Sequence, residues 1–225
     1  MWAFGAALFF LGSVGQAGEP GSAATSKFRE EVEAFAELPV PAPGGVLLVG
    51  SSIFKRWTNA AADLAPLPVT NRAFGGSQTS HQLMFFDQVV PPCRPDLIVW
   101  YCGSNDVKGG KDAGGVLART QEWIGKVHAA VPRAGILLVS VMDSPQKRRD
   151  GKSATVREVN RGLAKLAEKK ERVFYVEVNP ALENADGSAR AEFYLEDGLH
   201  LNPEGYRSLT GILRPAIEEH WKPKG

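Results

Sequence analysis

The chain has 225 residues, of which 44% are hydrophobic and 23% are charged. This composition is ordinary for a folded globular protein, and the length fits a single α/β domain whose core needs no covalent staples. With 26 basic and 25 acidic residues, the net charge is +1. The balance excludes a strongly basic nucleic-acid-binding protein and favours a neutral or weakly charged small partner.

The N-terminus has the pattern of a targeting segment. Residues Trp2 to Val14 carry no charge, and Gly15 and Ala17 place small side chains where a signal peptidase cleaves. The apolar stretch is shorter than the ~20 residues of a membrane span. We therefore expect a signal peptide over residues 1–17, a secreted or periplasmic protein and no membrane span after cleavage. An uncleaved anchor is the alternative.

The two cysteines, Cys93 and Cys102, are expected to be free thiols. A strand over residues 96–101 rises ~3.3 Å per residue, which holds the two beyond the ~7 Å that a disulfide tolerates. No Cys/His cluster has the spacing of zinc ligands, so we expect no metal and no cofactor.

An N-terminal segment over residues 18–45 precedes the main domain, which we place at residues 46–225. The segment contains one amphipathic helix, predicted from about Lys27 to Leu38, and then a stretch rich in Pro and Gly. The domain begins with the first of several short runs of Val, Ile and Leu that lack polar alternation. Such runs are typical of strands buried on both faces of a parallel sheet. Five strands are predicted, at residues 46–49, 68–71, 97–101, 136–141 and 173–176.

Helical patterns alternate with these runs. Apolar residues three or four apart mark two helix faces, at Val156, Val159, Leu163 and Leu166, and at Val116, Leu117, Ile124, Val127 and Val131. The last helix is predicted to begin with Asn202 as its cap and Pro203 at its first position, and Pro215 is expected to kink or end it. The alternation predicts a three-layer αβα sandwich around a doubly wound parallel sheet of about five strands, flavodoxin-like in fold.

Short motifs of small and polar residues follow three of the strands, and a fourth precedes the last helix. In an open parallel sheet, ligands bind at the carboxyl ends of the strands, so these motifs are expected to meet at one edge. In chain order they are Gly50-Ser51-Ser52-Ile53, Asn71-Arg72-Ala73-Phe74-Gly75-Gly76-Ser77, Gly103-Ser104-Asn105-Asp106 and Asp197-Gly198-Leu199-His200.

These residue types suit nucleophilic attack on a carbonyl group. Ser52 stands between a strand and a helix, and a serine hydroxyl attacks only when a neighbouring base takes its proton. His200 is the expected base, and Asp197, three residues earlier, can hold the imidazole in the right tautomer. The oxyanion needs fixed donors, for which the N–H groups of Ser52 and Gly76 and the side-chain amide of Asn105 are suited.

The four motifs, in this order, resemble the blocks of SGNH/GDSL-type hydrolases. The resemblance implies that Ser52 is the nucleophile, that Gly76 and Asn105 complete the oxyanion hole, and that Asp197 and His200 finish a catalytic triad. The resemblance extends from about Val46 to the last helix, which is most of the mature chain. The chain departs from the pattern at two positions: Ser51 stands where the family name has Asp, and Ala73 stands where a Gly is expected.

Structural roles compete with these catalytic ones. Ser52 can be a helix cap, and Asn105 and Asp106 can be ordinary turn formers, with Asp106 at most a support for the site. His81 is the only rival to His200, because His128 and His220 lie in helical stretches. Cys102 is expected to pack in the core, as are Trp57, Trp100 and Trp123.

The sequence therefore predicts a serine esterase that hydrolyses carboxylic esters through a covalent acyl-enzyme. Short acyl esters, such as O-acetyl groups on carbohydrate, are the first expectation for the substrate. The alternatives are an acyltransferase of the same fold and a non-catalytic, flavodoxin-like module that binds glycans.

Overall fold

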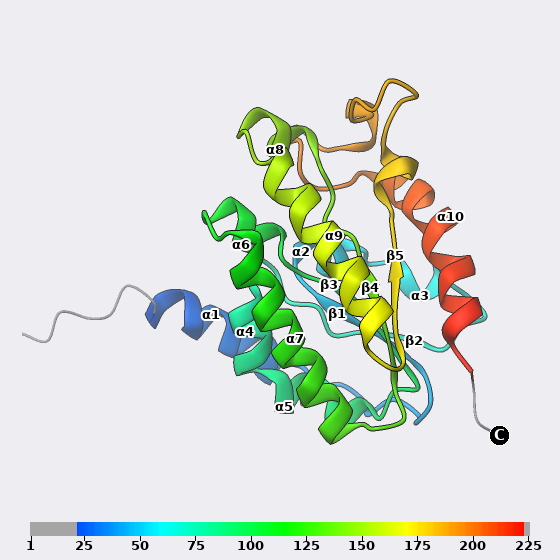
Figure 1. Cartoon of the computed structure of the whole chain (residues 1–225). Helices are drawn as coiled ribbons and strands as arrows, with labels where there is room; N and C mark the ends of the chain where they lie inside the picture. The colour runs from blue at the N-terminus through cyan, green and yellow to red at the C-terminus, as the bar shows by residue number, and fades with distance from the viewer. Residues whose placement is uncertain (1–21, 223–225) are drawn as a thin grey trace, which may run out of the picture.

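A computed structural model of the chain describes residues 22–222 (Figure 1). The predicted signal peptide at residues 1–17 lies outside the described residues. No helix among those described is both long and apolar enough to cross a bilayer.

The five predicted strands form one all-parallel sheet, which confirms the expected fold class. The strand order is β2-β1-β3-β4-β5, so the chain winds outward in both directions from β1. Only the fourth strand differs notably from its prediction. It stops at Val139. The Ser140 N–H still bonds to Val176 O, but the Val141 N–H and carbonyl bond to the Asn160 side chain instead of to a neighbouring strand. The strands are β1 (Val46–Gly50), β2 (Val69–Asn71), β3 (Leu97–Tyr101), β4 (Gly135–Val139) and β5 (Val173–Val176).

One face of the sheet is covered by helices from the first and middle parts of the chain (Figure 1). The predicted faces are buried there: Val116 and Val127 in one helix, Val159 and Leu163 in the next. Trp123 also lies in this core. The helices on this face are α1 (Ser22–Glu33), α4 (Thr79–Met84), α5 (Phe86–Val89), α7 (Ala113–Ala130) and α9 (Ser153–Lys169).

The opposite face is covered by α2 (Ser52–Arg56), α3 (Ala60–Asp63) and α10 (Pro203–His220). Trp57 and Leu213 are buried in this second core, which completes the three-layer sandwich. Short elements at the strand ends make up the rest: α6 (Ser104–Lys108), α8 (Pro145–Arg149), η1 (Pro91–Cys93), η2 (Asn179–Leu182) and η3 (Ala191–Phe193).

The first helix begins and ends about five residues earlier than predicted. Its apolar face is nevertheless used, because Phe28 and Val32 are buried in the core. Beyond Glu33 the backbone tightens into turns with hydrogen bonds between residues three apart, such as Phe35 N–H to Val32 O. Pro39 disfavours helical backbone at Leu38, so the helix could not have ended at Leu38 as predicted.

The last helix starts as predicted, with the Asn202 side chain as its cap and Pro203 at the first position. It continues past Pro215 to His220, so of the two expected effects of this proline, a kink or an end, the second is wrong. Leu213 and Ile217, on either side of it, are fully buried and hold the helix on the sheet. Pro215 itself is exposed, and so is Gly211, whose carbonyl loses its helical N–H donor to this proline.

Candidate active site

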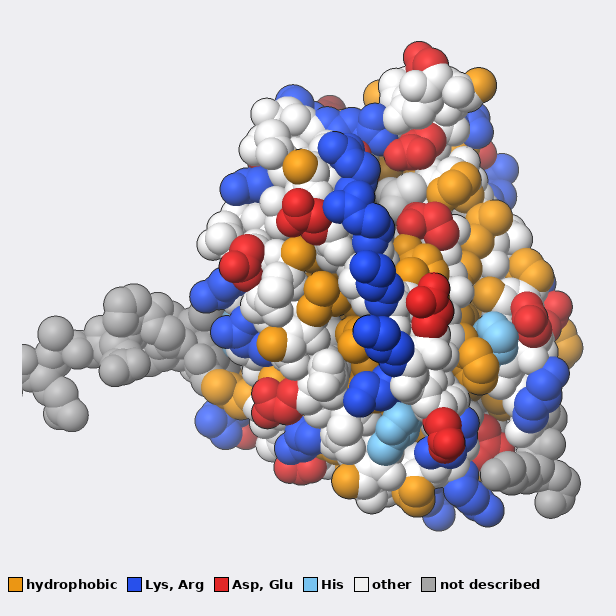
Figure 2. All heavy atoms as spheres, in the orientation of Figure 1, with side chains coloured by type: hydrophobic (Ala, Val, Ile, Leu, Met, Phe, Trp, Pro, Cys, Tyr) orange, Lys and Arg blue, Asp and Glu red, His pale blue; other side chains and the backbone are white. Residues whose placement is uncertain are grey.

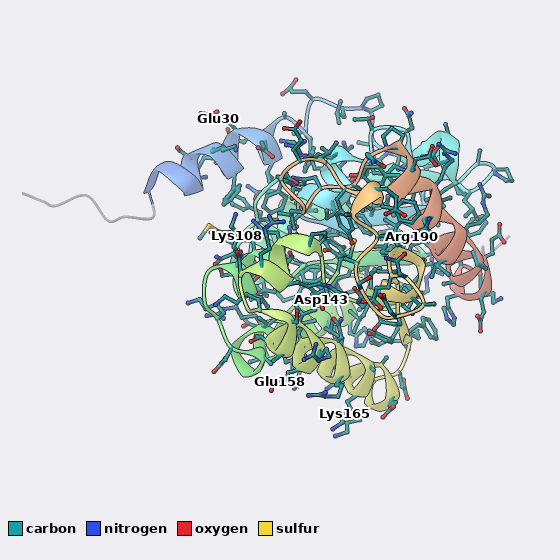
Figure 3. The ribbon with its side chains drawn as sticks, turned by 90° about the horizontal axis from the view of Figure 1, so that it is seen from above. Glu30, Lys108, Asp143, Glu158, Lys165 and Arg190 are labelled. Carbon is teal, nitrogen blue, oxygen red and sulfur yellow. The ribbon has the colours of Figure 1, made fainter. Side chains whose placement is uncertain are left out.

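Three of the four motifs are hydrogen-bonded to one another at the carboxyl edge of the sheet, which Figure 3 views from above. The Ser77 hydroxyl donates to Gly50 O at 3.3 Å, and the Asn105 side-chain amide donates to Ser77 O at 3.0 Å. These bonds join the ends of β1 and β3 to the loop after β2. The expected convergence of the motifs is thus present in the fold.

Ser52 is presented by a close contact between β1 and β3. Gly50 has a φ of +152°, and a Cβ atom there would lie 2.0 Å from Tyr101 O, so no other residue fits. The buried Ser51 then donates its N–H to the same carbonyl at 3.1 Å. Ser51 takes the cap position of α2, without a side-chain cap bond, which leaves Ser52 as the first helical residue. Ser52 is partly exposed, so its hydroxyl is accessible.

The fourth motif forms a tight turn that organises its own aspartate and histidine. Asp197 Oδ1 accepts the N–H groups of Leu199 and His200, both at 2.9 Å. Gly198 has a φ of +65°, a backbone conformation that side chains other than glycine rarely adopt. The turn closes with the Leu195 N–H donating to His200 O at 2.7 Å. This self-contained structure explains how the three-residue spacing fixes both side chains.

Ser52, His200 and Asp197 form a continuous chain of hydrogen-bonding groups. His200 Nε2 lies 2.9 Å from Ser52 Oγ, and His200 Nδ1 lies 2.5 Å from Asp197 Oδ2. The Ser52 and His200 side chains come from residues 148 positions apart. The nucleophile–base and base–orienter distances are both within the range that general-base activation of a serine requires.

Electrostatics favour an ionised Asp197. Burial alone would raise the pKa of its carboxyl group, but the hydrogen bonds from the His200 ring and from the backbone of His200 and Leu199 outweigh it and lower the pKa to about 2. The carboxylate therefore stays negative at any pH at which the imidazole can act as a base. A fixed negative charge beside Nδ1 stabilises the imidazolium that forms when Nε2 takes a proton.

The three expected oxyanion donors, Ser52, Gly76 and Asn105, belong to the three motifs that are hydrogen-bonded to one another. Gly76 has a φ of +80°, and neither its N–H nor that of Ser52 has an acceptor among residues 22–222. The Asn105 side-chain amide comes from the start of α6 and uses one of its two N–H groups to hold Ser77 O. Its second N–H has no acceptor among the described residues.

Helix α1 supports the loop that carries Gly76, a role that the sequence did not reveal. Glu31 accepts the Gly75 N–H at 3.0 Å and forms an ion pair with Lys55 at 2.8 Å. The Phe28 ring is the nearest group to the open side of Gly76, 4.0 Å from where a Cβ atom would be. The sequence of this charged helix contains no pattern that predicts which loop of the domain it contacts.

A second buried network fixes the loop from the side of α4. Asp106 is almost fully buried and accepts from both the N–H and the hydroxyl of Thr79, at 3.0 and 2.6 Å. Gln82 donates to Gly50 O at 2.9 Å and to the Ser77 hydroxyl at 2.8 Å. Asp106 therefore supports the site without facing Ser52, in line with the supporting role expected for it.

Helix α8 packs on the turn that carries Asp197 and His200. The Gln146 N–H donates to Gly198 O at 2.9 Å, and the Arg149 guanidinium donates to Asp197 O at 3.2 Å. Neither residue was predicted from the sequence. Short helices with no apolar periodicity offer no pattern from which such a contact can be predicted.

The other candidates for chemistry have structural roles. His81 lies in α4, where its Nδ1 accepts the Gln78 N–H at 3.0 Å and its ring packs on Phe28. Burial lowers the pKa of His81. Cys102 and Cys93 are free thiols buried in the core, and burial raises the pKa of both. Within residues 22–222, no group of three or more His, Cys, Asp or Glu side chains is arranged to hold a metal ion.

The architecture and the strand-end motifs define an α/β protein with the SGNH hydrolase fold. The model of the GDSL-like lipase/acylhydrolase family matches residues 46–208, which is more than half of the chain. The chain therefore belongs to the GDSL-like lipase/acylhydrolase family, and it is a carboxylic ester hydrolase. This family membership confirms the resemblance noted in the sequence.

Solved structures with the same fold are numerous, although all those described below are distant in sequence. One is a proposed platelet activating factor from Streptococcus pneumonia (22% identity, TM-score 0.76, covering 86% of this chain and 92% of that one). Another is a GDSL-like lipase from Bacteroides thetaiotaomicron (20% identity, TM-score 0.72, covering 87% of this chain and 98% of that one). A third is a carbohydrate esterase of family 3 from Talaromyces cellulolyticus (18% identity, TM-score 0.62, covering 78% of this chain and 97% of that one). No curated protein gave a significant match.

Proposed function

We propose that the protein hydrolyses short acyl esters of carbohydrate through a covalent intermediate on Ser52. The observation that carries this proposal is the unbroken hydrogen-bonded series from Ser52 Oγ through the His200 ring to the Asp197 carboxylate. The predicted signal peptide adds that the enzyme acts outside the cytoplasm, as a secreted or periplasmic protein.

In the first half of the reaction, His200 Nε2 takes the proton of Ser52 as Oγ attacks the ester carbonyl carbon. The carbonyl oxygen becomes an oxyanion, and the N–H groups of Ser52 and Gly76 and the amide of Asn105 donate hydrogen bonds to it. His200 then returns the proton to the leaving alcohol oxygen. The bond from the carbonyl carbon to that oxygen breaks, which leaves the acyl group on Ser52.

In the second half, water replaces the alcohol. His200 removes a proton from the water as its oxygen attacks the acyl carbon, and the same donors hold the second oxyanion. Collapse of this intermediate returns the proton to Ser52 Oγ and releases the carboxylic acid. Asp197 remains a carboxylate throughout and holds the imidazole in orientation.

Two observations support a small acyl group on a carbohydrate. Phe28 lies beside the open face of Gly76, next to the place where the carbonyl group would bind, and it limits the room there. An acetyl esterase and a carbohydrate esterase are among the proteins with a similar fold. An acetyl group needs little space at the oxyanion, and the alcohol part of the ester can extend toward solvent.

The test compares ester hydrolysis by the wild type, Ser52→Ala and Ser51→Ala. Aryl acetate, aryl butyrate and aryl octanoate measure the preference for acyl length, and release of acetate from acetylated xylan tests the carbohydrate ester. We expect acetate to be the best acyl group, Ser52→Ala to be inactive and Ser51→Ala, which keeps the candidate nucleophile, to retain hydrolysis. An active Ser52→Ala variant, or an enzyme that prefers octanoate, would contradict the proposal.

A further inference from the structure

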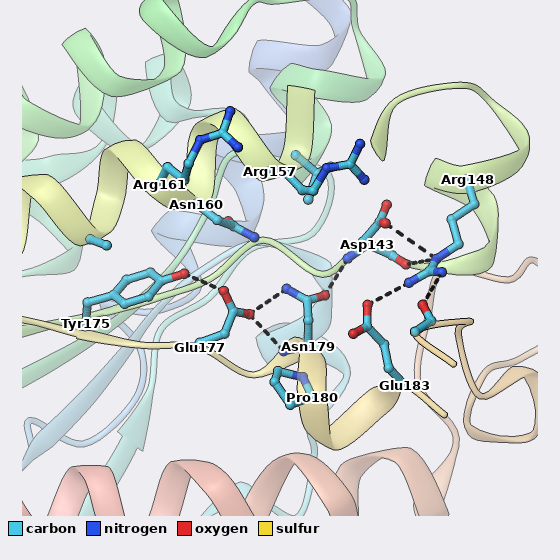
Figure 4. Close-up of a pocket in the computed structure, with 13 residues that line it drawn as sticks. Asp143, Arg148, Arg157, Asn160, Arg161, Tyr175, Glu177, Asn179, Pro180 and Glu183 are labelled. Atoms are coloured by element: carbon cyan, nitrogen blue, oxygen red, sulfur yellow. Dashed lines mark hydrogen bonds and ion pairs between the residues drawn. The ribbon is translucent and has the colours of Figure 1, made fainter. Parts of the chain in front are cut away.

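A cavity outside the candidate active site lies at the carboxyl edge of the sheet, between α9 and the segment that follows β5 (Figure 4). Its volume is about 660 Å³, which is enough for one or two sugar rings. None of the residues that form the candidate active site lines it. Side chains from α9 form one wall, and residues from β5 and η2 form the other.

The wall formed by β5 and η2 is a fixed polar network. The Tyr175 hydroxyl donates to Glu177 at 2.6 Å, and Asn179 donates to the same carboxylate at 2.7 Å. Although burial opposes ionisation, these bonds lower the pKa of Glu177, so it is a carboxylate. At the end nearest α8, Arg148 forms an ion pair with Glu183 at 2.6 Å. This wall offers carboxylate oxygens that can accept further hydrogen bonds, and the edge of an aromatic ring.

The opposite wall carries charges that nothing in the described part of the chain neutralises. Arg157 and Arg161 stand one helical turn apart on α9, and both are exposed. Neither has a hydrogen bond or an ion pair with any other residue in the range 22–222. Figure 4 shows both guanidinium groups apart from the network on the other wall. One wall of the cavity thus has carboxylate oxygens that can accept hydrogen bonds from hydroxyl groups of a ligand, and the other has two unpaired guanidinium groups.

The two arginines begin a row of basic side chains along α9. Arg157, Arg161, Lys165 and Lys169 are each four residues apart, so they lie about 6 Å from one another along the axis and span about 18 Å. We call these four residues the basic row. Figure 2 shows Lys and Arg side chains continuing over α9 from the α8 end, and Lys165 points away from the body of the protein in Figure 3. The acidic residues of α9 form no ion pair with the row.

We propose that this cavity and the basic row bind an acidic polysaccharide, with one sugar in the cavity and its carboxylate paired with Arg157 and Arg161. Sugar hydroxyl groups would donate to the carboxylates of the opposite wall, and the ring would lie against Tyr175. Neighbouring carboxylates along the same polymer would meet Lys165 and Lys169. This binding does not depend on hydrolysis, and so it goes beyond the proposed esterase reaction.

The chemistry of the surroundings favours a polysaccharide over other polyanions. Exposed apolar side chains beside the cations strengthen peripheral membrane binding, but the exposed large hydrophobic residues of the described chain, Leu38, Val40, Met84 and Leu195, lie outside α9. A DNA strand would bring phosphates without hydroxyl donors against Glu177 and Glu183, where like charges repel. A ligand with both hydroxyl groups and anionic groups, such as an acidic polysaccharide, complements the two walls.

The cavity is connected to the candidate active site through α8. Arg148 holds the cavity end of this helix, and its neighbour Arg149 donates to Asp197 O in the turn that carries His200. Both features lie at the same edge of the sheet. A polymer held along the basic row therefore has its end close to the edge at which Ser52 is exposed.

Binding is measured with the full chain by affinity electrophoresis and calorimetry. The probes are de-esterified polygalacturonate, alginate and hyaluronan, with dextran as the neutral polymer. A dT20 oligonucleotide and phosphatidylglycerol vesicles test the other two classes of polyanion. We expect at least one acidic polysaccharide to bind, dextran not to bind, and the Ser52→Ala variant to bind like the wild type. The last result separates this proposal from the proposed hydrolysis.

The double variant Arg157→Gln/Arg161→Gln removes the two charges of the cavity wall. We expect it to bind the acidic polysaccharide at least tenfold more weakly, while hydrolysis of a small aryl ester stays unchanged. The matched control, Arg133→Gln/Lys222→Gln, removes two exposed charges at the opposite edge of the sheet and should bind within twofold of the wild type. Thermal unfolding checks that all variants are folded.

Three results would overturn the proposal. The first is that none of the three acidic polysaccharides binds. The second is equal binding by the cavity variant and the wild type, which would show a nonspecific charge effect. The third is tighter binding of dT20 or of the vesicles than of any polysaccharide, which would assign the row to a nucleic acid or a membrane.

Discussion

Replacing Asp197 with Asn separates the charge of this residue from its role in shaping the turn. Asp197 Oδ1 accepts two backbone N–H groups, and Oδ2 faces His200 Nδ1 at 2.5 Å. An Asn that keeps its oxygen toward the backbone places its NH₂ group against Nδ1. The imidazole must then accept at Nδ1 and carry its proton on Nε2, where it cannot take the proton of Ser52. The opposite amide orientation sets NH₂ against two N–H donors.

The expected loss of kcat can be estimated from the catalytic triad of serine hydrolases. There the equivalent exchange lowers kcat by about 10⁴-fold, because the wrong tautomer dominates. The Asp197 side chain is 46% exposed, so water can partly replace its interaction with the ring. We therefore expect a smaller loss of about 10³-fold in kcat, or about 4 kcal/mol of transition-state stabilisation.

The assay is steady-state hydrolysis of an aryl acetate by the wild type, Asp197→Asn and the matched control Glu196→Gln. The control removes a neighbouring exposed charge that has no hydrogen bond in the described structure, and its kcat should stay within twofold of the wild type. A kcat for Asp197→Asn within threefold of the wild type, in a folded protein, would refute the role of Asp197 as the residue that orients His200.

Three further predictions concern charge, support and stability. Because the pKa of Asp197 is lowered to about 2, its carboxylate stabilises the fold above about pH 4, and this contribution is lost as the pH falls toward 2. In urea unfolding, the difference in free energy of unfolding between the wild type and Asp197→Asn should therefore decrease over that range. Glu31→Ala frees the loop before α4 and should lower kcat about tenfold with little change in KM, whereas Glu30→Ala should leave kcat unchanged. An equal loss of kcat in the two variants would count against the supporting role of Glu31. Asn160 bonds both polar groups of the Val141 backbone, so Asn160→Ala should lower the free energy of unfolding by about 2–3 kcal/mol, and a loss below about 0.5 kcal/mol would contradict this.

The fold was predictable because its signals are local and strong. Residues 97–101 and 173–176 are strands with the predicted bounds, since runs of apolar residues without alternation have no stable place except inside a covered sheet. The end of the last helix was not predictable from Pro215. Its position depends on the burial of Leu213 and Ile217, which is a tertiary effect.

The candidate site was predictable to the extent that each motif builds its own geometry. The turn from Asp197 to His200 is held by bonds within the motif, so its spacing alone identifies the pair. The contacts of Glu31 and Arg149 with these motifs depend on how separate helices dock, and no local pattern reveals them. The basic row was also missed, because its members are four residues apart and do not form a run of charges.

Labelling with a fluorophosphonate shows directly whether His200 activates Ser52, because this reagent forms a covalent adduct only with a serine that a neighbouring base activates. The labelled residue is identified by mass spectrometry of peptides from the wild type, Ser51→Ala and His200→Ala. We predict a single adduct on Ser52 in the wild type and in Ser51→Ala, and none in His200→Ala. An adduct on Ser51, or labelling of Ser52 that persists without His200, would contradict the account.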